Sequence, residues 1–290
     1  MATLTQRGSA DGIVVIQATP PVNRNPYYTL LAPYLREFGH EIIFSSDFDE
    51  IAKHVLSLDT SREPKPALVH LHQLEPLYRA RDEQGNRTAA RRFVDWVVKL
   101  RMLGASIVYT MHNRQPHDRR LLGLDREVHT LISPVVSRVV VHGDAAVEPA
   151  ERWFPPEKIS VVRHPNFVDV YGPECPREYA RRDLQVGTDE FVVLALGEIK
   201  PYKGLELVLN GFERASIPEA RLLIVGRNGD EEYVRKIEDL VAVLGFSKVR
   251  LVVRTVPEEE ISTWLGVADV AVFGFEEILM SGSVMLALSY

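Results

Sequence analysis

The sequence predicts an α/β protein made of two doubly wound parallel-sheet domains. Ten short apolar runs alternate with helical patterns along nearly the whole chain, which is typical of βαβ units. The runs are almost continuously hydrophobic, as expected for strands that are buried on both faces. At 290 residues, the chain is long for one domain and comfortable for two.

Composition and charge restrict the class of protein. Apolar residues make up 46% of the chain and charged residues 26%, so a substantial core can be buried. The net charge of −6 argues against a protein that coats nucleic acid, and we expect no nucleic-acid partner. A single cysteine, no secretory signal and no bilayer-length apolar run together predict a cytoplasmic protein.

Six strands are expected in the first half of the chain and four in the second. Those of the first half are GIVVIQA (12–18), HEIIFSS (40–46), ALVHLHQ (67–73), ASIVYTMHN (105–113), RVVVHG (138–143) and KISVVRH (158–164). Those of the second half are FVVLALG (191–197), ARLLIVG (220–226), KVRLVV (248–253) and ADVAVF (268–273).

Four helices follow from apolar spacing and from end signals, and their apolar stripes are expected to face the core. The stripes are Leu31, Tyr34, Leu35 and Phe38, ending at Gly39; Leu205, Val208, Leu209 and Phe212; and Ile261, Trp264, Leu265 and Ala268, in a helix that begins at Pro257. In the remaining helix, Asp230 is the expected N-cap and Gly245 the expected end.

Prolines, glycines and charges interrupt the alternation between about residues 165 and 188. We therefore predict an N-terminal domain (1–168), a linker (169–188) and a C-terminal domain (189–290). The final stretch SGSVMLALSY reads as the start of a buried helix with no end signal and no following strand. The second domain is accordingly expected to be truncated.

The junction GEIKPYKG (197–204) carries the most chemical information. Gly197 ends a strand and Gly204 opens a helix, and glycine lets the backbone approach a ligand closely. Lys200 and Lys203 supply positive charge at the carboxyl end of the sheet, where ligands of α/β proteins bind. The combination suits a diphosphate, and a solvated Lys-Pro-Tyr-Lys loop is the alternative.

The order of motifs over residues 190–290 resembles the C-terminal domain of GT-B glycosyltransferases, in the large group that includes GT4. The motifs are the GEIKPYKG junction, LLIVG, RLVVRTV, the PEEEI helix, and ADVAVF followed by glutamate. In the first half, GHEIIFSS, ALVHLH and IVYTMHN resemble the acceptor domain of the same family. The resemblance implies two Rossmann-like domains facing a cleft. It also implies retaining transfer of a hexose from a nucleotide-sugar donor to a saccharide or lipid-linked acceptor, as in polysaccharide biosynthesis.

The resemblance implies a cationic contact to the donor diphosphate. The lysine of the family's KG motif falls on Lys203, where it neutralises the departing diphosphate. Family members usually carry an arginine directly after the strand-end glycine, but this chain has Glu198. We take Lys200, two residues further on, as the substitute.

Further donor contacts are implied near the end of the chain. The first of the family's two glutamates falls on Glu277, which the resemblance implies to be catalytic together with His112 and Lys203, and Glu276 is the alternative. The second falls close to Leu286, so that this ribose contact is missing. SGSV is expected to start a helix that meets phosphate. The remaining expected donor contacts are Ser281, Gly282 and Ser283 at that helix start, and Arg254 and Val256 in a turn beside the base.

In the first half, histidines stand at the ends of expected strands. His112 falls on the family's acceptor-domain histidine, which implies hydrogen bonding to the sugar or the leaving phosphate, with some general acid assistance. His142 and His164 end two further strands and are candidates for lining the same cleft.

Two further features have two interpretations each. Asn23, Arg24 and Asn25 either face the donor phosphate or acceptor, or form a proline-stiffened turn. Residues 79–101 carry seven basic and three acidic side chains. This excess either attracts anionic lipid headgroups, giving peripheral contact with the inner face of the membrane, or belongs to an ordinary amphipathic helix, which we favour slightly.

No metal or other cofactor is expected, because a cationic pocket can stabilise the departing diphosphate by itself. The sequence has no cysteine or histidine cluster with zinc spacing. His70 and His72 alternate on a strand, so we expect them to point to opposite faces. Asp47-Phe48-Asp49 matches the D-x-D metal motif of the GT-A fold, but its surroundings indicate a solvated turn.

Two other functions remain as alternatives. A nicotinamide-dependent oxidoreductase requires G-x-G-x-x-G after an early strand, but the first loop reads ATPPVNRNPY and the LLIVG strand leads only to GRNGD. A non-catalytic, nucleotide-binding or degenerate transferase is consistent with Glu198, Leu286 and the expected truncation.

Overall fold

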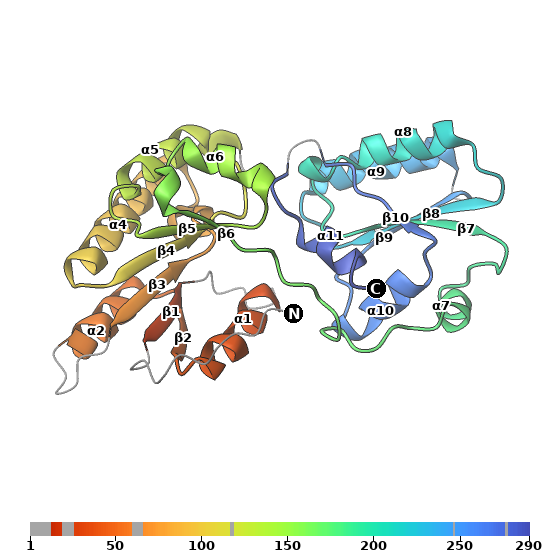
Figure 1. The fold of residues 1–290 in the computed structure, drawn as a ribbon. Helices are drawn as coiled ribbons and strands as arrows, with labels where there is room; N and C mark the ends of the chain where they lie inside the picture. Colours follow the sequence, from red (N-terminus) through yellow and green to blue (C-terminus); the bar gives the residue numbers. More distant parts are fainter. Residues whose placement is uncertain (1–12, 19–25, 60–65, 117–118, 246, 276–277) are drawn as a thin grey trace. The chain divides into compact units, whose positions relative to one another are not determined.

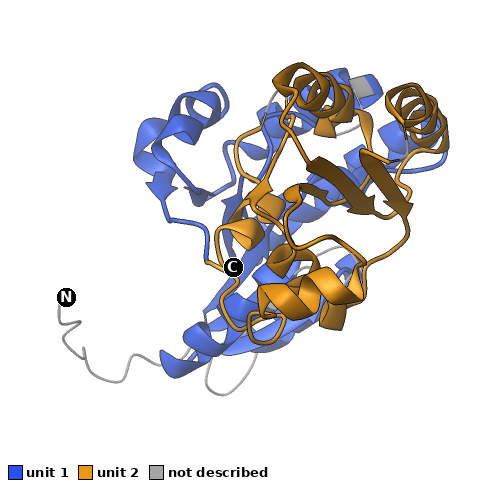
Figure 2. Cartoon of the chain, turned by 90° about the vertical axis from the view of Figure 1, so that its right-hand side faces the viewer, with its two compact units in different colours: residues 1–165 blue, residues 166–290 orange. Residues whose placement is uncertain are grey.

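The chain folds into two compact units, Met1–Pro165 and Asn166–Tyr290 (Figure 2). The computed structural model describes residues 13–18, 26–59, 66–116, 119–245, 247–275 and 278–290. Each unit is built around one parallel sheet with helices on both faces (Figure 1). The predicted α/β class with parallel sheets is therefore confirmed.

The sheet of the first unit has the strand order β2-β1-β3-β4-β5-β6. Its strands are β1 (Val14–Ala18), β2 (Glu41–Ser45), β3 (Ala67–Leu71), β4 (Ser106–Thr110), β5 (Arg138–Val141) and β6 (Ile159–Val161). Each coincides with a predicted strand. Strand β1 pairs with β2 on one side and β3 on the other, so the strand order reverses between β1 and β3. This reversal is the topological switch point of the unit.

Helices cover both faces of this sheet (Figure 1). They are α1 (Pro26–Glu37), α2 (Phe48–Asp59), α3 (Glu75–Tyr78), α4 (Glu83–Met102), α5 (Leu122–Ile132) and α6 (Val147–Glu151), with short 3-10 turns η1 (Arg119–Leu121), η2 (Asp144–Ala146) and η3 (Pro156–Lys158). Helix α4 carries most of the basic stretch, and Phe93, Trp96 and Val97 on its apolar side are buried within the unit. The described helices include none that is both long enough and apolar enough to cross a bilayer.

The first predicted helix has the expected end but not the expected buried stripe. Gly39, at a φ of +81°, follows α1 as predicted. Tyr34 and Phe38, however, are 63% and 64% exposed. Tyr27 and Ala32 are buried instead. Part of the stripe prediction for this helix is therefore wrong.

The sheet of the second unit has the order β10-β7-β8-β9. Its strands are β7 (Phe191–Leu196), β8 (Ala220–Gly226), β9 (Val249–Val253) and β10 (Val270–Ala271), and its helices are α7 (Arg177–Asp183), α8 (Leu205–Ala215), α9 (Glu231–Leu244), α10 (Glu258–Gly266) and α11 (Gly282–Ala287). Helices α8 and α9 lie on one face and α7 and α10 on the other (Figure 1). Strand β7 lies between β8 and β10, so the switch point lies between β7 and β10.

The helix signals of the second unit are confirmed. Asp230 caps α9, and its carboxylate accepts a hydrogen bond from the N–H of Tyr233 at 2.9 Å. Gly245 ends that helix at a φ of +97°. Leu209 of α8 and Trp264 of α10 are both 1% exposed, so the predicted stripes of these two helices face the core.

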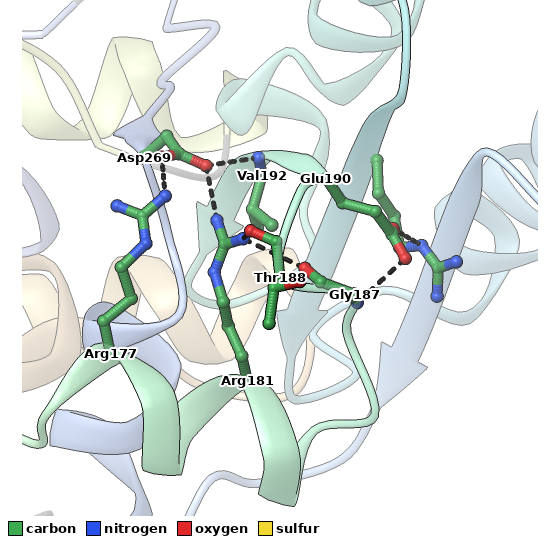
Figure 3. Close-up of polar contacts among 8 residues, drawn as sticks. Arg177, Arg181, Gly187, Thr188, Glu190, Val192 and Asp269 are labelled. Atoms are coloured by element: carbon green, nitrogen blue, oxygen red, sulfur yellow. Dashed lines mark hydrogen bonds and ion pairs between the residues drawn. The ribbon is translucent and has the colours of Figure 1, made fainter.

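Residues 169–188, which the sequence predicts to be a linker, include helix α7, and this helix is fixed to the second unit (Figure 3). The guanidinium of Arg181 is buried and contacts the Asp269 carboxylate at 2.8 Å. The same carboxylate accepts a hydrogen bond from the backbone N–H of Val192 at 2.6 Å. It also forms an ion pair with Arg177. Because these contacts satisfy the charge of Arg181, a charged, proline-bounded segment can pack as a helix.

Candidate functional site

A candidate ligand site lies at the switch point of the second unit, where β7 and β10 end. A small cavity there is lined by residues that follow both strands, among them Gly197, Glu198, Lys203, Phe273 and Phe275. In open α/β sheets, ligands bind outside the carboxyl ends of the strands at such a reversal of strand order. Two of the predicted donor residues therefore lie where the topology itself favours a ligand.

The loop after β7 is held directly against the loop after β10. A short 3-10 turn, η4 (Pro201–Lys203), leads into Gly204, whose φ is +58°. A Cβ atom at Gly204 would lie 1.9 Å from the carbonyl oxygen of Gly274. Only a glycine fits this left-handed and closely packed position, and the two loops therefore meet at a fixed place.

The ammonium of Lys203 is the central charge of this site. Its Nζ lies 4.7 Å from the ring centroid of Phe275, 5.3 Å from that of Tyr202 and 3.4 Å from Oγ of Ser283. Burial lowers the pKa of Lys203 to about 8, and Glu198 opposes part of this shift. A partly dehydrated cation held in place by aromatic rings is well suited to binding an anion.

Lys200, the predicted second cation, is engaged by Glu198. Its Nζ lies 3.1 Å from Oε1 of Glu198, and the same oxygen lies 3.0 Å from Nη2 of Arg227. Sequence reasoning missed Arg227, which directly follows β8 in the stretch GRNGD. The sequence signal that could have identified Arg227 is its position directly after the predicted strand ARLLIVG, at the same edge of the sheet.

The predicted serine contacts lie around the start of α11. The helix begins at Gly282, as the sequence predicts, and Ser281 is its N-cap. The Ser281 hydroxyl accepts a hydrogen bond from the N–H of Val284 at 3.3 Å. The Ser283 hydroxyl instead contacts Lys203, so Ser283 and Lys203 lie together while Ser281 caps its own helix.

The predicted base-binding turn lies two strands away from β7. Arg254 follows β9, and Nη1 of its guanidinium lies 3.2 Å from the Glu260 carboxylate. Val256 packs against the buried cluster that includes Trp264. Neither Arg254 nor Val256 is among the described residues that line the Lys203 cavity.

Five of the predicted site residues lie outside the described residues. They are Glu276 and Glu277, after β10, and Asn23, Arg24 and Asn25, after β1. The roles that the resemblance implies for them remain predictions.

In the first unit, histidine rings gather at the carboxyl ends of four neighbouring strands. The rings of His72, His112, His142 and His164 follow β3, β4, β5 and β6, and they surround Tyr27 at centroid distances of 5.6, 4.9, 5.3 and 5.1 Å. We call these four residues, together with His70, the histidine set. The predicted residues His112 and His142 therefore lie together, with rings 5.2 Å apart.

Burial lowers the pKa of every member of the histidine set. It lowers the pKa of His70 and of His112 to about 3, and it lowers the pKa of His72 well below its usual value. Nδ1 of His142 donates to the carbonyl oxygen of Val162 at 2.8 Å. Among the described residues, Nε2 of His112 and of His142 are buried without a hydrogen-bond partner. Such buried polar atoms are uncommon in folded proteins, and a bound ligand or water would supply the partner that these two lack.

The prediction that His70 and His72 point to opposite faces is wrong, because their ring centroids lie 4.0 Å apart. Strand β3 ends at Leu71, so the alternation of a strand does not extend to His72. Within the described part of the chain, no group of three or more histidine, cysteine, aspartate or glutamate side chains is arranged to hold a metal ion.

The D-x-D motif begins helix α2. Oδ1 of Asp47 accepts hydrogen bonds from the backbone N–H groups of Asp49 and Glu50, both at 2.9 Å. Asp47 is exposed, as predicted for a solvated segment. Its carboxylate therefore acts as a helix cap.

Comparison with known proteins agrees with this geometry. A family model described as "Glycosyl transferases group 1" matches residues 176–276. A GDP-mannose:glycolipid 4-beta-D-mannosyltransferase of Xanthomonas campestris pv. campestris is 24% identical over 99% of this chain and 74% of the relative. A D-inositol 3-phosphate glycosyltransferase of Thermobispora bispora is 28% identical over 62% of this chain and 46% of the relative.

Solved structures show the same fold over nearly the whole chain. Alr3699/HepE from Anabaena, in complex with UDP-glucose, aligns with a TM-score of 0.65 and 14% identity, covering 93% of this chain and 76% of that one. Sucrose-phosphate synthase from Thermosynechococcus elongatus aligns with a TM-score of 0.65 and 16% identity, covering 96% and 79%. The predicted GT-B fold is therefore confirmed.

Two parallel sheets, each with its own switch point, and the alignments with these solved structures show that the chain has the GT-B fold. Within that class, the family match confirms the resemblance to the group 1 glycosyl transferases that the motifs indicate.

Proposed function

We propose that this chain transfers a hexose from a nucleotide-sugar donor to a saccharide or lipid-linked acceptor, in the manner of the GT4-like enzymes, and that Lys203 binds the donor diphosphate. The observation that carries the proposal is the Lys203 ammonium, which lies at the β7/β10 switch point beside two aromatic rings and the Ser283 hydroxyl. The geometry supports an anion at this position.

The chemistry requires such a cation. When the glycosyl phosphate bond breaks, negative charge grows on the departing diphosphate, and a positive charge already in place stabilises it. The Lys203 site can supply this charge from the protein itself. In this proposal His112, a neutral ring at the end of β4, donates or accepts hydrogen bonds with the sugar, and Glu277 contacts the donor sugar as the resemblance implies.

Relatives suggest the class of donor and acceptor. The printed name of the Xanthomonas relative joins a GDP-mannose donor to a glycolipid acceptor. That of the Thermobispora relative names an inositol phosphate acceptor. We therefore place a mannose or related hexose nucleotide first in a donor screen and a lipid-linked saccharide first among acceptors, which would bring the protein to the cytoplasmic face of a membrane.

The test combines binding and turnover on the full chain. Binding of GDP, UDP and their hexose conjugates is measured by calorimetry, and product formation by mass spectrometry. Lys203→Met, which removes the charge and keeps the length of the side chain, should weaken nucleoside diphosphate binding about tenfold or more. The control is Lys236→Met, an exposed lysine of α9 paired with Glu206. Equal binding in wild type and Lys203→Met would exclude the phosphate role.

The stereochemical course needs its own measurement. Our proposal is retention, as the resemblance implies, whereas the Xanthomonas relative is named for a beta-linked product. The anomeric coupling constant of the isolated product, compared with that of the donor, decides between retention and inversion. An inverted product would overturn this part of the proposal and leave the donor site untouched.

The same experiments separate the alternatives. A nicotinamide-dependent oxidoreductase would be stabilised by NADH in a thermal shift assay and not by GDP or UDP. A non-catalytic relative would bind a nucleoside diphosphate at Lys203 and give no transfer with any donor in the screen.

A further inference from the structure

The carboxylate of Glu198 forms ion pairs with two cations, Lys200 and Arg227, which follow two neighbouring strands. Its Oε1 lies 3.1 Å from Nζ of Lys200, in the loop after β7, and 3.0 Å from Nη2 of Arg227, directly after β8. Glu198 also lines the cavity that Lys203 lines. Glu198 therefore links Lys200 and Arg227, which are not among the described residues that line the cavity, to the site that holds Lys203. We call these three cations and Glu198 the rim of the site.

The backbone fixes this arrangement. The N–H of Ile199 donates to the carbonyl oxygen of Arg227 at 3.0 Å, and the N–H of Gly229 donates back to Ile199 at 3.2 Å. A Cβ atom at Gly229 would lie 2.6 Å from Cγ of Glu198 and 2.7 Å from Cγ of Lys200. The loop after β8 is thus packed tightly against the loop after β7, beyond the ends of both strands.

The charges of this rim act on one another. Burial raises the pKa of Tyr202 to about 12, with Glu198 adding to the shift and Arg227 opposing it. The ring of Tyr202 is one of the two beside the Lys203 ammonium. Arg227 therefore acts on a ring that lies beside Lys203, while the pKa of Lys203 itself responds to burial, Glu198 and Lys200.

We propose that Arg227 is the second phosphate-binding cation of the donor site, held by Glu198 and supplied by β8. The inference rests on the proposed function, since it names a further residue of the same donor site. It also accounts for Glu198 at the position where the resembled family usually has an arginine. In this proposal a second positive charge remains at the rim, but it belongs to Arg227 after β8 and not to the residue after Gly197.

Arg227 fits this role better than Lys200. The Arg227 side chain is 59% exposed, whereas that of Lys200 is 31% exposed and lies against Gly229. A guanidinium presents several N–H donors in one plane, so it can bind two phosphate oxygens while one N–H group stays on a carboxylate. A lysine ammonium binds phosphate only as a point charge.

The test compares single variants of the full chain by calorimetry, with UDP and GDP as probes and uridine and guanosine as controls for the base. Arg227→Met should weaken binding of the preferred diphosphate about tenfold or more and leave nucleoside binding unchanged. Arg227→Lys should recover part of the loss. The matched control is Arg235→Met, an exposed arginine on α9, which should bind as the wild type does.

The outcomes distinguish this inference from the proposed function. If Lys203→Met loses diphosphate binding while Arg227→Met keeps it, the role of Arg227 is overturned and the donor site stands. If Lys200→Met shows the loss that we expect of Arg227→Met, Lys200 is the second cation and the inference is again overturned. If neither Lys203→Met nor Arg227→Met changes binding, the donor site itself is wrong. Circular dichroism and thermal unfolding of each variant show that the comparison is made on folded protein.

Discussion

At the scale of single residues, the role that we propose for Lys203 would couple ligand binding to protonation. Its ammonium is partly removed from water and lies against aromatic rings, so burial lowers its pKa to about 8. A diphosphate bound beside it would favour the protonated form and raise that pKa again. Because the charged form binds the anion and the neutral form does not, affinity must follow the protonation of this one group.

We therefore predict that diphosphate binding weakens as pH rises through about 8. With a pKa of about 8, the protonated fraction of Lys203 falls about fourfold between pH 7 and pH 8.5, and the dissociation constant should rise by the same factor. Calorimetry over this range measures it. Lys203→Arg keeps its charge throughout and should give a nearly flat profile. A wild-type profile as flat as that of Lys203→Arg would contradict the coupling.

Single residues also show what a sequence can reveal about a site. Lys203 could be predicted because its motif is local: a strand-end glycine, a lysine and a helix-opening glycine follow one another along the chain. Arg227 could not, because its contact with Glu198 exists only once β7 and β8 are paired in register. The histidine set was predicted in part, residue by residue, but the convergence of four of its rings on Tyr27 was not.

At the scale of elements, strands were easier to predict than helix faces. Strands in the middle of the sheets, such as β1 and β8, are largely buried, so an apolar run is enough to locate them. The edge strands β2 and β6 are more exposed, but β2 and β6 also fall in short apolar runs. Helix α1 carries two stripes of the same spacing, one through Tyr28 and Ala32 and one through Tyr34 and Phe38, and both include Leu31 and Leu35. Spacing cannot decide between them. The structure buries the first stripe, where Tyr28 and Ala32 are 5% and 2% exposed.

Lys203 ends the turn η4, directly before helix α8, and the close approach of Gly204 and Gly274 holds this turn against the loop after β10. We predict that Gly204→Ala destabilises the second unit by about 2–4 kcal/mol, because the new methyl group would overlap the Gly274 carbonyl at a left-handed φ. Urea unfolding measures the change. Gly211→Ala is the matched control, because a Cβ there meets no atom within 4 Å and alanine favours a helix, so it should stabilise by roughly 0.5–1 kcal/mol. Similar changes in the two variants would contradict the close approach of the loops.

At the scale of the whole molecule, the sequence predicted the architecture more fully than its chemistry. All ten strands and the two parallel sheets follow from alternating apolar runs. The structure adds helix α7, which is not apparent in a segment rich in proline and charge. This helix is stable because the buried Arg181 lies beside Asp269, a residue distant in the sequence. Local patterns thus establish the elements, and the contacts between distant segments determine the rest.

The two units also differ in how they should respond to acid. All nine histidines of the chain lie in the first unit. Burial lowers the pKa of every member of the histidine set below the value of about 6.5 expected in the unfolded chain. The unfolded chain therefore binds more protons than the folded one as pH falls below about 6.5. The histidine contribution to stability is complete above that pH and is lost below it.

We predict that acidification from pH 7 to pH 5 destabilises the first unit and leaves the second nearly unchanged. Each buried histidine removes up to roughly 1 kcal/mol of unfolding free energy per pH unit over this range, because it stays neutral in the folded state and takes up a proton in the unfolded one. Hydrogen exchange with mass spectrometry resolves the units by their peptides. His70→Gln, whose amide can still bond Thr110, should show a shallower pH dependence than the wild type. Equal losses of protection in both units would show that some other group governs acid stability.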